Sequence, residues 1–91
     1  MTTTDIQART HAYIAENFLY MRPSFRLEAD DSLLEHGIID SMGVMELIVF
    51  VEEEFCIAVG DEEITEDNFG SVQAIANYVS VKRAGGGALT T

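Results

Sequence analysis

Mainly apolar residues recur every three or four positions in three stretches of the chain, and this spacing predicts amphipathic helices. The first predicted helix begins with a capping box formed by Thr4 and Gln7 and ends at Tyr20 or Met21. Pro23 follows and disfavours helical backbone at the residue before it. The positions of this helix that we expect to face a core are Ile6, Thr10, Tyr13, Ile14, Phe18 and Met21.

The second predicted helix, residues 41–55, is the most apolar part of the chain. Met42, Met45 and Val49 lie off its core-facing stripe, so more of this helix is apolar than one buried face requires. Two interpretations are possible for these three residues: they pack under the preceding loop, or they are exposed on a partner-binding surface. The core-facing stripe itself is Val44, Leu47, Ile48, Val51 and Phe55.

The segment between these helices, residues 24–39, shows no sustained periodicity and predicts a long loop. Ser32-Leu33-Leu34-Glu35 can form one capped turn, in which Leu33 or Leu34 holds the loop on the core. Gly37 supplies backbone freedom just before the second helix.

The last third of the chain predicts one short and one longer helix. Carboxylates at residues 61–63 suit the first turn of the short helix, which Ile64 and Phe69 anchor and Gly70 ends. Ser71 then caps the last helix, whose core positions are Val72, Ile75, Ala76 and Val79. The prediction is an all-α four-helix bundle with three longer helices, a short third helix and a long loop between helices one and two.

Composition adds limits to this picture. The length suits one domain, predicted over residues 1–84, with residues 85–91 as a flexible Gly-rich tail. Five basic against sixteen acidic residues give a net charge of −11, which disfavours nucleic acid and anionic membranes and favours basic protein partners. Cys56 is expected to be a buried small hydrophobe. With no pattern of a signal peptide or a membrane span, we expect a cytoplasmic monomer without membrane insertion.

The pair Asp40-Ser41 stands where the loop becomes the second helix. Both residue types cap helices, and a hydroxyl at the positive end of the helix dipole also suits a phosphate. A hydrolase that uses Ser41 and His36 is disfavoured, because Ile39 stands where a nucleophile elbow needs glycine. The acidic clusters lack the spacing of a calcium-binding loop, so we predict no metal site.

These residues resemble the acyl carrier protein family. Asp40-Ser41-Met42 is similar to the family's Asp-Ser-Leu attachment motif, and residues 51–55 are similar to the end of its second helix, within a resemblance that covers residues 6–81. The resemblance implies that Ser41 carries covalent 4′-phosphopantetheine, with Asp40 in a supporting role. A phosphopantetheinyl transferase would install this arm from coenzyme A. The arm's thiol would hold acyl or aminoacyl groups as thioesters for partner enzymes, and the carrier itself would have no catalytic activity.

The same resemblance implies a partner-binding surface on the second helix. Basic patches of loading and transferring enzymes would dock on Met42, Met45, Glu46, Val49, Glu52 and Glu53. Gly43 stands where fatty-acid carriers usually have aspartate and should loosen the helix start, and Phe50 replaces a smaller residue. Residues 64–69 are more similar to carriers of dedicated pathways, including amino-acid carriers, so fatty-acid and aminoacyl biosynthesis both stay open. The alternative is an unmodified acidic helical adaptor that binds a basic partner through helix two.

Overall fold

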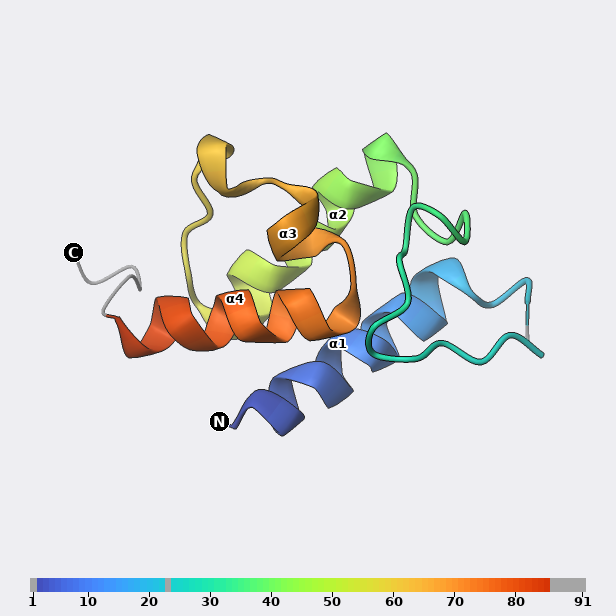
Figure 1. Cartoon of the computed structure of the whole chain (residues 1–91), viewed down its shortest axis with the longest axis horizontal. Coiled ribbons are helices and arrows are strands. Elements are labelled where there is room, and N and C mark those ends of the chain that lie inside the picture. Colours follow the sequence, from blue (N-terminus) through green and yellow to red (C-terminus); the bar gives the residue numbers. More distant parts are fainter. Residues whose placement is uncertain (1, 23, 86–91) are drawn as a thin grey trace.

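Helices make up the regular structure of this protein, seen in a computed structural model that describes residues 2–22 and 24–85 (Figure 1). No strand is present within these two ranges. Both α1 and α3 pack against α4. The predicted all-α bundle, like that of the acyl carrier proteins, is confirmed. Its elements are α1 (Thr3–Phe18), α2 (Ser41–Phe55), a 3₁₀ turn η1 (Asp61–Glu63), α3 (Glu66–Phe69) and α4 (Val72–Ala84).

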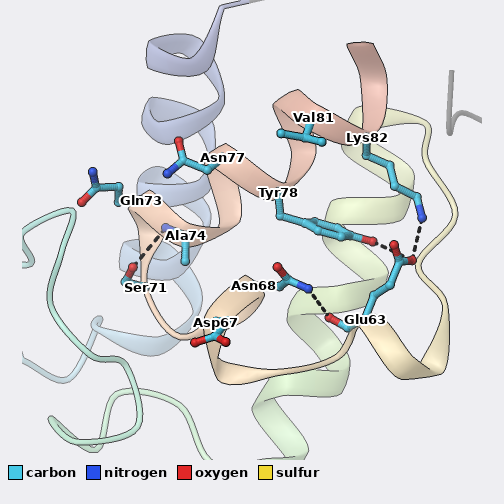
Figure 2. A pocket seen from close by; sticks show the side chains of 10 residues that line it. All are labelled: Glu63, Asp67, Asn68, Ser71, Gln73, Ala74, Asn77, Tyr78, Val81 and Lys82. Atoms are coloured by element: carbon cyan, nitrogen blue, oxygen red, sulfur yellow. Dashed lines mark hydrogen bonds and ion pairs between the residues drawn. The ribbon is translucent and has the colours of Figure 1, made fainter. Parts of the chain in front are cut away.

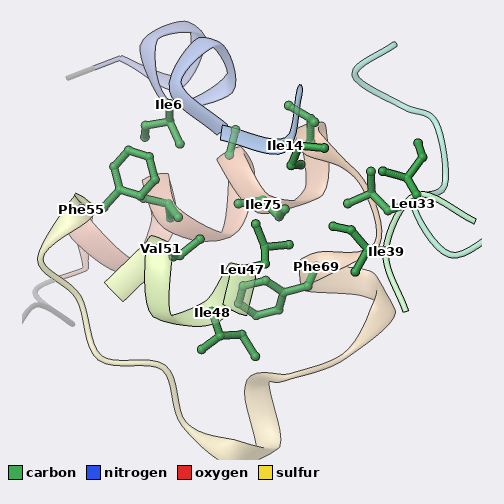
Figure 3. Close-up of a cluster of buried hydrophobic side chains, with 14 of the residues drawn as sticks. Ile6, Ile14, Leu33, Ile39, Leu47, Ile48, Val51, Phe55, Phe69 and Ile75 are labelled. Carbon is green, nitrogen blue, oxygen red and sulfur yellow. The ribbon is translucent and has the colours of Figure 1, made fainter. Parts of the chain in front are cut away.

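The hydrophobic core joins α1, α2, α4 and the loop before α2 (Figure 3). The four positions predicted on α4 are all buried, as are four of the five on α2; Val44 is only partly buried. Ile6, Thr10 and Ile14 carry the buried side of α1, as their spacing predicted. Helical periodicity therefore identified most of the core.

The capping box predicted at Thr4 and Gln7 is wrong, because the helix begins two residues earlier. Thr2 is the N-cap: its hydroxyl accepts from Asp5 N at 3.1 Å, and the Asp5 carboxylate accepts from Thr2 N at 3.1 Å. An ionised carboxylate is a stronger acceptor than the Gln7 amide, and it also gains from the helix dipole.

The end of α1 also differs from the prediction, since the helix stops at Phe18 rather than Tyr20 or Met21. Leu19 leaves the helical conformation at φ −112° and ψ 6°, yet its side chain is buried. Met21, predicted to face the core, is 78% exposed. Once the backbone leaves the helix, the spacing that would have turned Met21 inward no longer applies.

Two backbone hydrogen bonds join the long loop to the last third of the chain. Leu33 N donates to Gly70 O at 2.9 Å, and Gln73 N donates to Ala29 O at 2.8 Å. The predicted turn is present, because the Ser32 hydroxyl accepts from Glu35 N at 3.2 Å. Leu33 is buried and Leu34 is exposed, so Leu33 is the residue that holds the loop on the core.

The single short helix predicted from residue 61 is instead two short pieces. A 3₁₀ turn covers Asp61–Glu63, and the extended backbone of Thr65 then separates it from α3. The Thr65 hydroxyl caps α3 by accepting from Asn68 N at 3.3 Å. The Thr65 cap therefore starts a second helix, α3, and the run of carboxylates at residues 61–63 did not predict this break.

The Glu63 carboxylate holds this segment on α4 (Figure 2). One oxygen accepts from Lys82 Nζ at 2.6 Å, from Tyr78 OH at 3.1 Å and from Gly60 N at 2.8 Å. The bond from Lys82, followed by the backbone bond from Gly60, lowers the pKa of Glu63 below its ordinary value. The same bond to Glu63 raises the pKa of Lys82.

Replacing Glu63 by glutamine should destabilise the fold at pH 7 and much less at pH 3. A carboxylate with a lowered folded-state pKa contributes stability that is present above its unfolded pKa of 4.5 and is lost as pH falls through the folded value. We expect a loss of about 1–2 kcal/mol at neutral pH, measured by urea unfolding at both pH values. The exposed neighbour provides the control: Glu62→Gln should change little at either pH, and an equal loss in both variants would contradict this assignment.

Cys56 is exposed, which corrects the prediction of a buried side chain. It ends α2 in the left-handed region at φ 56° and ψ 50°, with its N–H donating to Glu52 O. Ile57 N also donates to Glu52 O, at 3.3 Å, and Ile57 takes the buried place after the helix. The turn of the backbone therefore directs Cys56 outward.

Substituting glycine for Cys56 should stabilise the protein. A side chain at positive φ destabilises the folded state by about 1–2 kcal/mol, and glycine removes this cost. Glycine also raises the entropy of the unfolded chain, which offsets part of the benefit, so we expect a net gain of about 0.5–1 kcal/mol in the free energy of unfolding. The midpoint of thermal unfolding measures the gain. Cys56→Ala removes the same thiol but keeps Cβ at positive φ, so it should give no comparable gain; equal stabilisation by both would trace the effect to the thiol instead.

Candidate functional site

At the start of α2, Asp40 caps the helix and Ser41 presents its hydroxyl to solvent. Asp40 is the N-cap, and its Oδ1 accepts from Gly43 N at 2.8 Å. Ser41 is the first residue of the helix and is exposed. Because Asp40 provides the cap, the Ser41 hydroxyl is available for chemistry at the positive end of the α2 dipole.

The loop residues just before this pair fix its position. Ile38 and Ile39 are buried, and Ile38 N donates to Leu33 O at 2.9 Å. Gly37 lies at φ +67°, a conformation that glycine adopts without strain, as its place in the loop predicted. The buried Ile38 and Ile39 before the pair and helix α2 after it thus fix the position of the exposed Ser41 hydroxyl.

Gly43 has a different role from the one the sequence indicated. It is buried, and a Cβ there would lie 3.0 Å from a Phe18 ring carbon and 3.0 Å from an Ile39 methyl carbon. Rather than loosening the start of α2, this glycine lets the helix approach α1 closely. An aspartate here would meet Phe18 and Ile39 before it reached the surface beside Ser41.

An apolar pocket of about 280 Å³ opens next to Ser41, between α2, the long loop and α3. Ile39 and Phe69 contribute to its apolar walls, and Thr65 and Glu66 contribute polar groups. A group attached to the Ser41 hydroxyl can therefore bend back into a partly enclosed apolar space. The sequence predicted these residues as core or loop and did not indicate a pocket.

The outer face of α2 carries the predicted partner-binding residues. Met42, Met45 and Val49 are 79%, 58% and 51% exposed, so they do not pack under the loop. Glu46 and Glu53 are exposed too. Glu52 is partly buried, and its Oε2 accepts from Val59 N at 3.0 Å, so this carboxylate also serves the fold.

His36, considered above as a partner for Ser41 in a hydrolase, makes other contacts. Its ring packs edge-on against Phe25 at 5.7 Å between centroids, and its Nε2 lies 3.7 Å from Asp31 Oδ1. No hydrogen bond joins it to Ser41 in the part of the chain that the structure describes. In the same part, no group of three potential metal-ligating side chains comes together, and no helix is long and apolar enough to cross a membrane.

The bundle and its exposed serine have the features of a small carrier domain, which holds its cargo on a covalent arm and leaves the chemistry to other enzymes. Comparison with known proteins agrees, because residues 14–79 match the family described as "Phosphopantetheine attachment site". The chain belongs to this family of phosphopantetheine-binding carrier proteins. Its cofactor is covalently attached 4′-phosphopantetheine, and carriers of this family are not catalysts themselves.

Known relatives include D-alanyl carrier proteins of streptococci. Those of Streptococcus sanguinis, Streptococcus gordonii and Streptococcus thermophilus are each 37% identical to this chain over 54 residues. The matched segment covers 59% of this chain and 68% of each relative.

The site is compatible with the family's cofactor. An arm joined through a phosphodiester needs an accessible hydroxyl that the fold does not use, and Ser41 offers one. When bound, 4′-phosphopantetheine supplies a thiol at the end of a flexible chain. The positive end of the α2 dipole, where Ser41 lies, favours an added negative charge.

Proposed function

We propose that Ser41 is the attachment residue and that the loaded arm carries an aminoacyl thioester. The observation that carries the first part is the exposed hydroxyl at the first position of α2, beside an N-cap provided by Asp40. In the attachment step, Ser41 Oγ attacks the β-phosphate of coenzyme A and 3′,5′-ADP leaves. The serine proton passes to a base of the transferase, because a serine without a base is a weak nucleophile.

Partner enzymes dock on the outer face of α2. The exposed Met42, Met45 and Val49 provide an apolar contact, while Glu46 and Glu53 face basic residues of the partner. Glu52 contributes less, because its carboxylate is bonded to Val59 N. Tethering the cargo to a docked carrier keeps it at high effective concentration near each active site.

The aminoacyl cargo is supported by two observations. The relatives at 37% identity are D-alanyl carrier proteins. Glu66, at the lining of the pocket beside Ser41, offers a carboxylate to the ammonium group of an aminoacyl thioester. A long fatty-acyl chain has no such cation to place there.

A loading assay tests both parts. The protein is first treated with coenzyme A and a broad-specificity phosphopantetheinyl transferase, and intact mass should show one added arm. The product is then offered to an enzyme that loads D-alanine onto a carrier protein and, separately, to a fatty-acyl loading enzyme. We expect alanylation and little fatty acylation. Efficient fatty acylation without alanylation would assign the protein to fatty-acid biosynthesis instead.

We propose further that residues 1–84 form the carrier domain and that it works as a monomer in the cytoplasm. The predicted tail, residues 85–91, lies outside the described residues apart from Gly85, which follows α4. The unmodified adaptor that the sequence left open, binding a basic partner through α2, does not fit a family with a covalently attached arm, and it requires function to survive loss of the Ser41 hydroxyl.

A further inference from the structure

The segment of residues 60–70 forms one wall of the pocket beside Ser41, and α2 forms another. Ile64 and Phe69 line the pocket from this segment, and Met45 lines it from α2. In the part of the chain that the structure describes, no hydrogen bond joins α2 to this segment. The distance between these two walls therefore depends on what holds the segment from its other side.

The Glu63 carboxylate is what holds the segment on α4 (Figure 2). Its Oε1 accepts from Lys82 Nζ at 2.6 Å and from Tyr78 OH at 3.1 Å, and both donors belong to α4. Asn68 Nδ2 donates to Glu63 O at 2.8 Å, which joins the 3₁₀ turn to α3. We call the contacts of Glu63 with Tyr78 and Lys82 the Glu63 latch. None of these three residues lines the pocket, so the latch acts on the pocket only through the position of the segment.

The latch is ionised over the whole physiological pH range. The bond from Lys82 lowers the pKa of Glu63 below 4.5, and the same bond raises the pKa of Lys82 above 10.5. Both groups are therefore charged at neutral pH, where a charge-assisted hydrogen bond is stronger than a neutral one. The latch acts as a fixed spacer rather than as a pH switch.

We propose that the Glu63 latch positions the wall of the pocket and thereby limits the length of the cargo that the pocket accepts. A short acyl or aminoacyl group enters between α2 and the segment as they stand, whereas a long acyl chain must push the segment away from α2. Moving the segment strains the bonds from Lys82 and Tyr78, and only long cargo bears this free-energy cost. The inference rests on the proposed function for the identity of the cargo, and it names residues outside the pocket that make the carrier selective.

Amide hydrogen exchange of the apo protein tests whether the latch holds the segment. Lys82→Met keeps a long apolar side chain but removes the ammonium group, so the amides of residues 68–70 should exchange about two- to fivefold faster. Arg83→Met is the control, because Arg83 is the next residue of α4 but donates to Phe55 O instead. Equal acceleration at residues 68–70 in both variants would show a general loosening of the bundle and overturn the latch.

The loaded protein tests the effect on cargo. A broad-specificity phosphopantetheinyl transferase attaches the acetyl or the hexadecanoyl form of the arm from the corresponding acyl-coenzyme A, and intact mass confirms loading. Cleavage of the thioester by hydroxylamine then reports burial, because a chain held in the pocket shields its thioester from this nucleophile. In Lys82→Met the hexadecanoyl thioester should be cleaved about two- to fivefold more slowly than in the parent, with the acetyl thioester unchanged. The same change for both chains, or none for the long chain, would overturn the proposal.

Tyr78→Phe keeps the proposal testable if Lys82→Met folds poorly. It removes one bond to Glu63 and retains the ring that lies 5.1 Å from the Phe69 ring, so both measurements should move in the same direction by a smaller amount. A folded Tyr78→Phe variant with unchanged exchange and cleavage would contradict the latch. Failure of attachment at Ser41 would be seen by mass and would count against the proposed function, whereas the exchange measurement uses apo protein and does not depend on it.

Discussion

The Ser41→Ala variant should gain no phosphopantetheine under conditions in which the parent protein is fully modified. The alanine side chain has no nucleophilic oxygen, so no phosphodiester can form at this position. The fold should persist, because Ser41 is exposed and Asp40 provides the N-cap; we expect a change in unfolding free energy within about 0.5 kcal/mol. Intact mass after incubation with coenzyme A and transferase measures the modification.

A matched serine gives the control for this experiment. Ser71 is the N-cap of α4, and its hydroxyl accepts from Ala74 N at 3.1 Å. Ser71→Ala should lose about 1 kcal/mol of stability but keep full modification, the reverse of the result expected for Ser41→Ala. A thiol titration supplies a second readout, because Cys56 is the only cysteine and attachment should raise the reactive thiols from one to two per chain.

Two outcomes would change the interpretation. If Ser41→Ala still gains the arm, another residue is the attachment site. If the parent protein gains no arm from a transferase shown to be active on a known carrier, the adaptor interpretation becomes the stronger one. Reversing the charge of Glu46 and Glu53 would then be the next experiment, because the adaptor requires that face of α2.

Replacing Phe55 by alanine should have the largest effect on stability, lowering the unfolding free energy by about 3–5 kcal/mol. Phe55 ends α2 and is fully buried among α1, α2 and α4 (Figure 3), where it also packs against the Phe50 ring at 5.8 Å. Losing the ring removes buried apolar surface and leaves a cavity inside the bundle. For a domain of this size, such a loss removes much of the total stability.

Val49→Ala is the control on the same helix. Val49 is half exposed on the outer face, so we expect a change within about 0.5 kcal/mol. Urea unfolding of both variants measures the difference. A loss of less than about 1 kcal/mol in Phe55→Ala would mean that the bundle closes around the vacated space, and the packing described above would then be wrong.

Periodicity predicted α2 well because its signal is local. The run from residue 41 to 55 repeats apolar residues every three or four positions, and the acceptor that starts the helix is adjacent in sequence. At the start of α1, three consecutive threonines offered several caps of similar quality, and the carboxylate of Asp5 decided among them. Cys56 was assigned to the core from its apolar neighbours, but a left-handed turn directs it into solvent.

The candidate attachment motif could also be read from the chain, since Asp40, Ser41 and the following helix are contiguous. Two tertiary features could not. The pocket beside Ser41 joins residues of the loop, α2 and α3, and the stacked rings of Tyr13 and Phe50 join α1 to α2. Glu52 and Glu53 are neighbours of the same type, yet only Glu52 is bonded to Val59 N.

The sequence by itself determined the helical class, most of the core residues and the position of the candidate serine. Each of these depends on residue type and spacing within a few turns of one segment. The tertiary structure alone decided which polar groups are used by the fold and which face solvent. That distinction depends on contacts between segments far apart in the chain, such as Leu33 with Gly70 and Phe18 with Gly43, because burial is a property of the packed bundle.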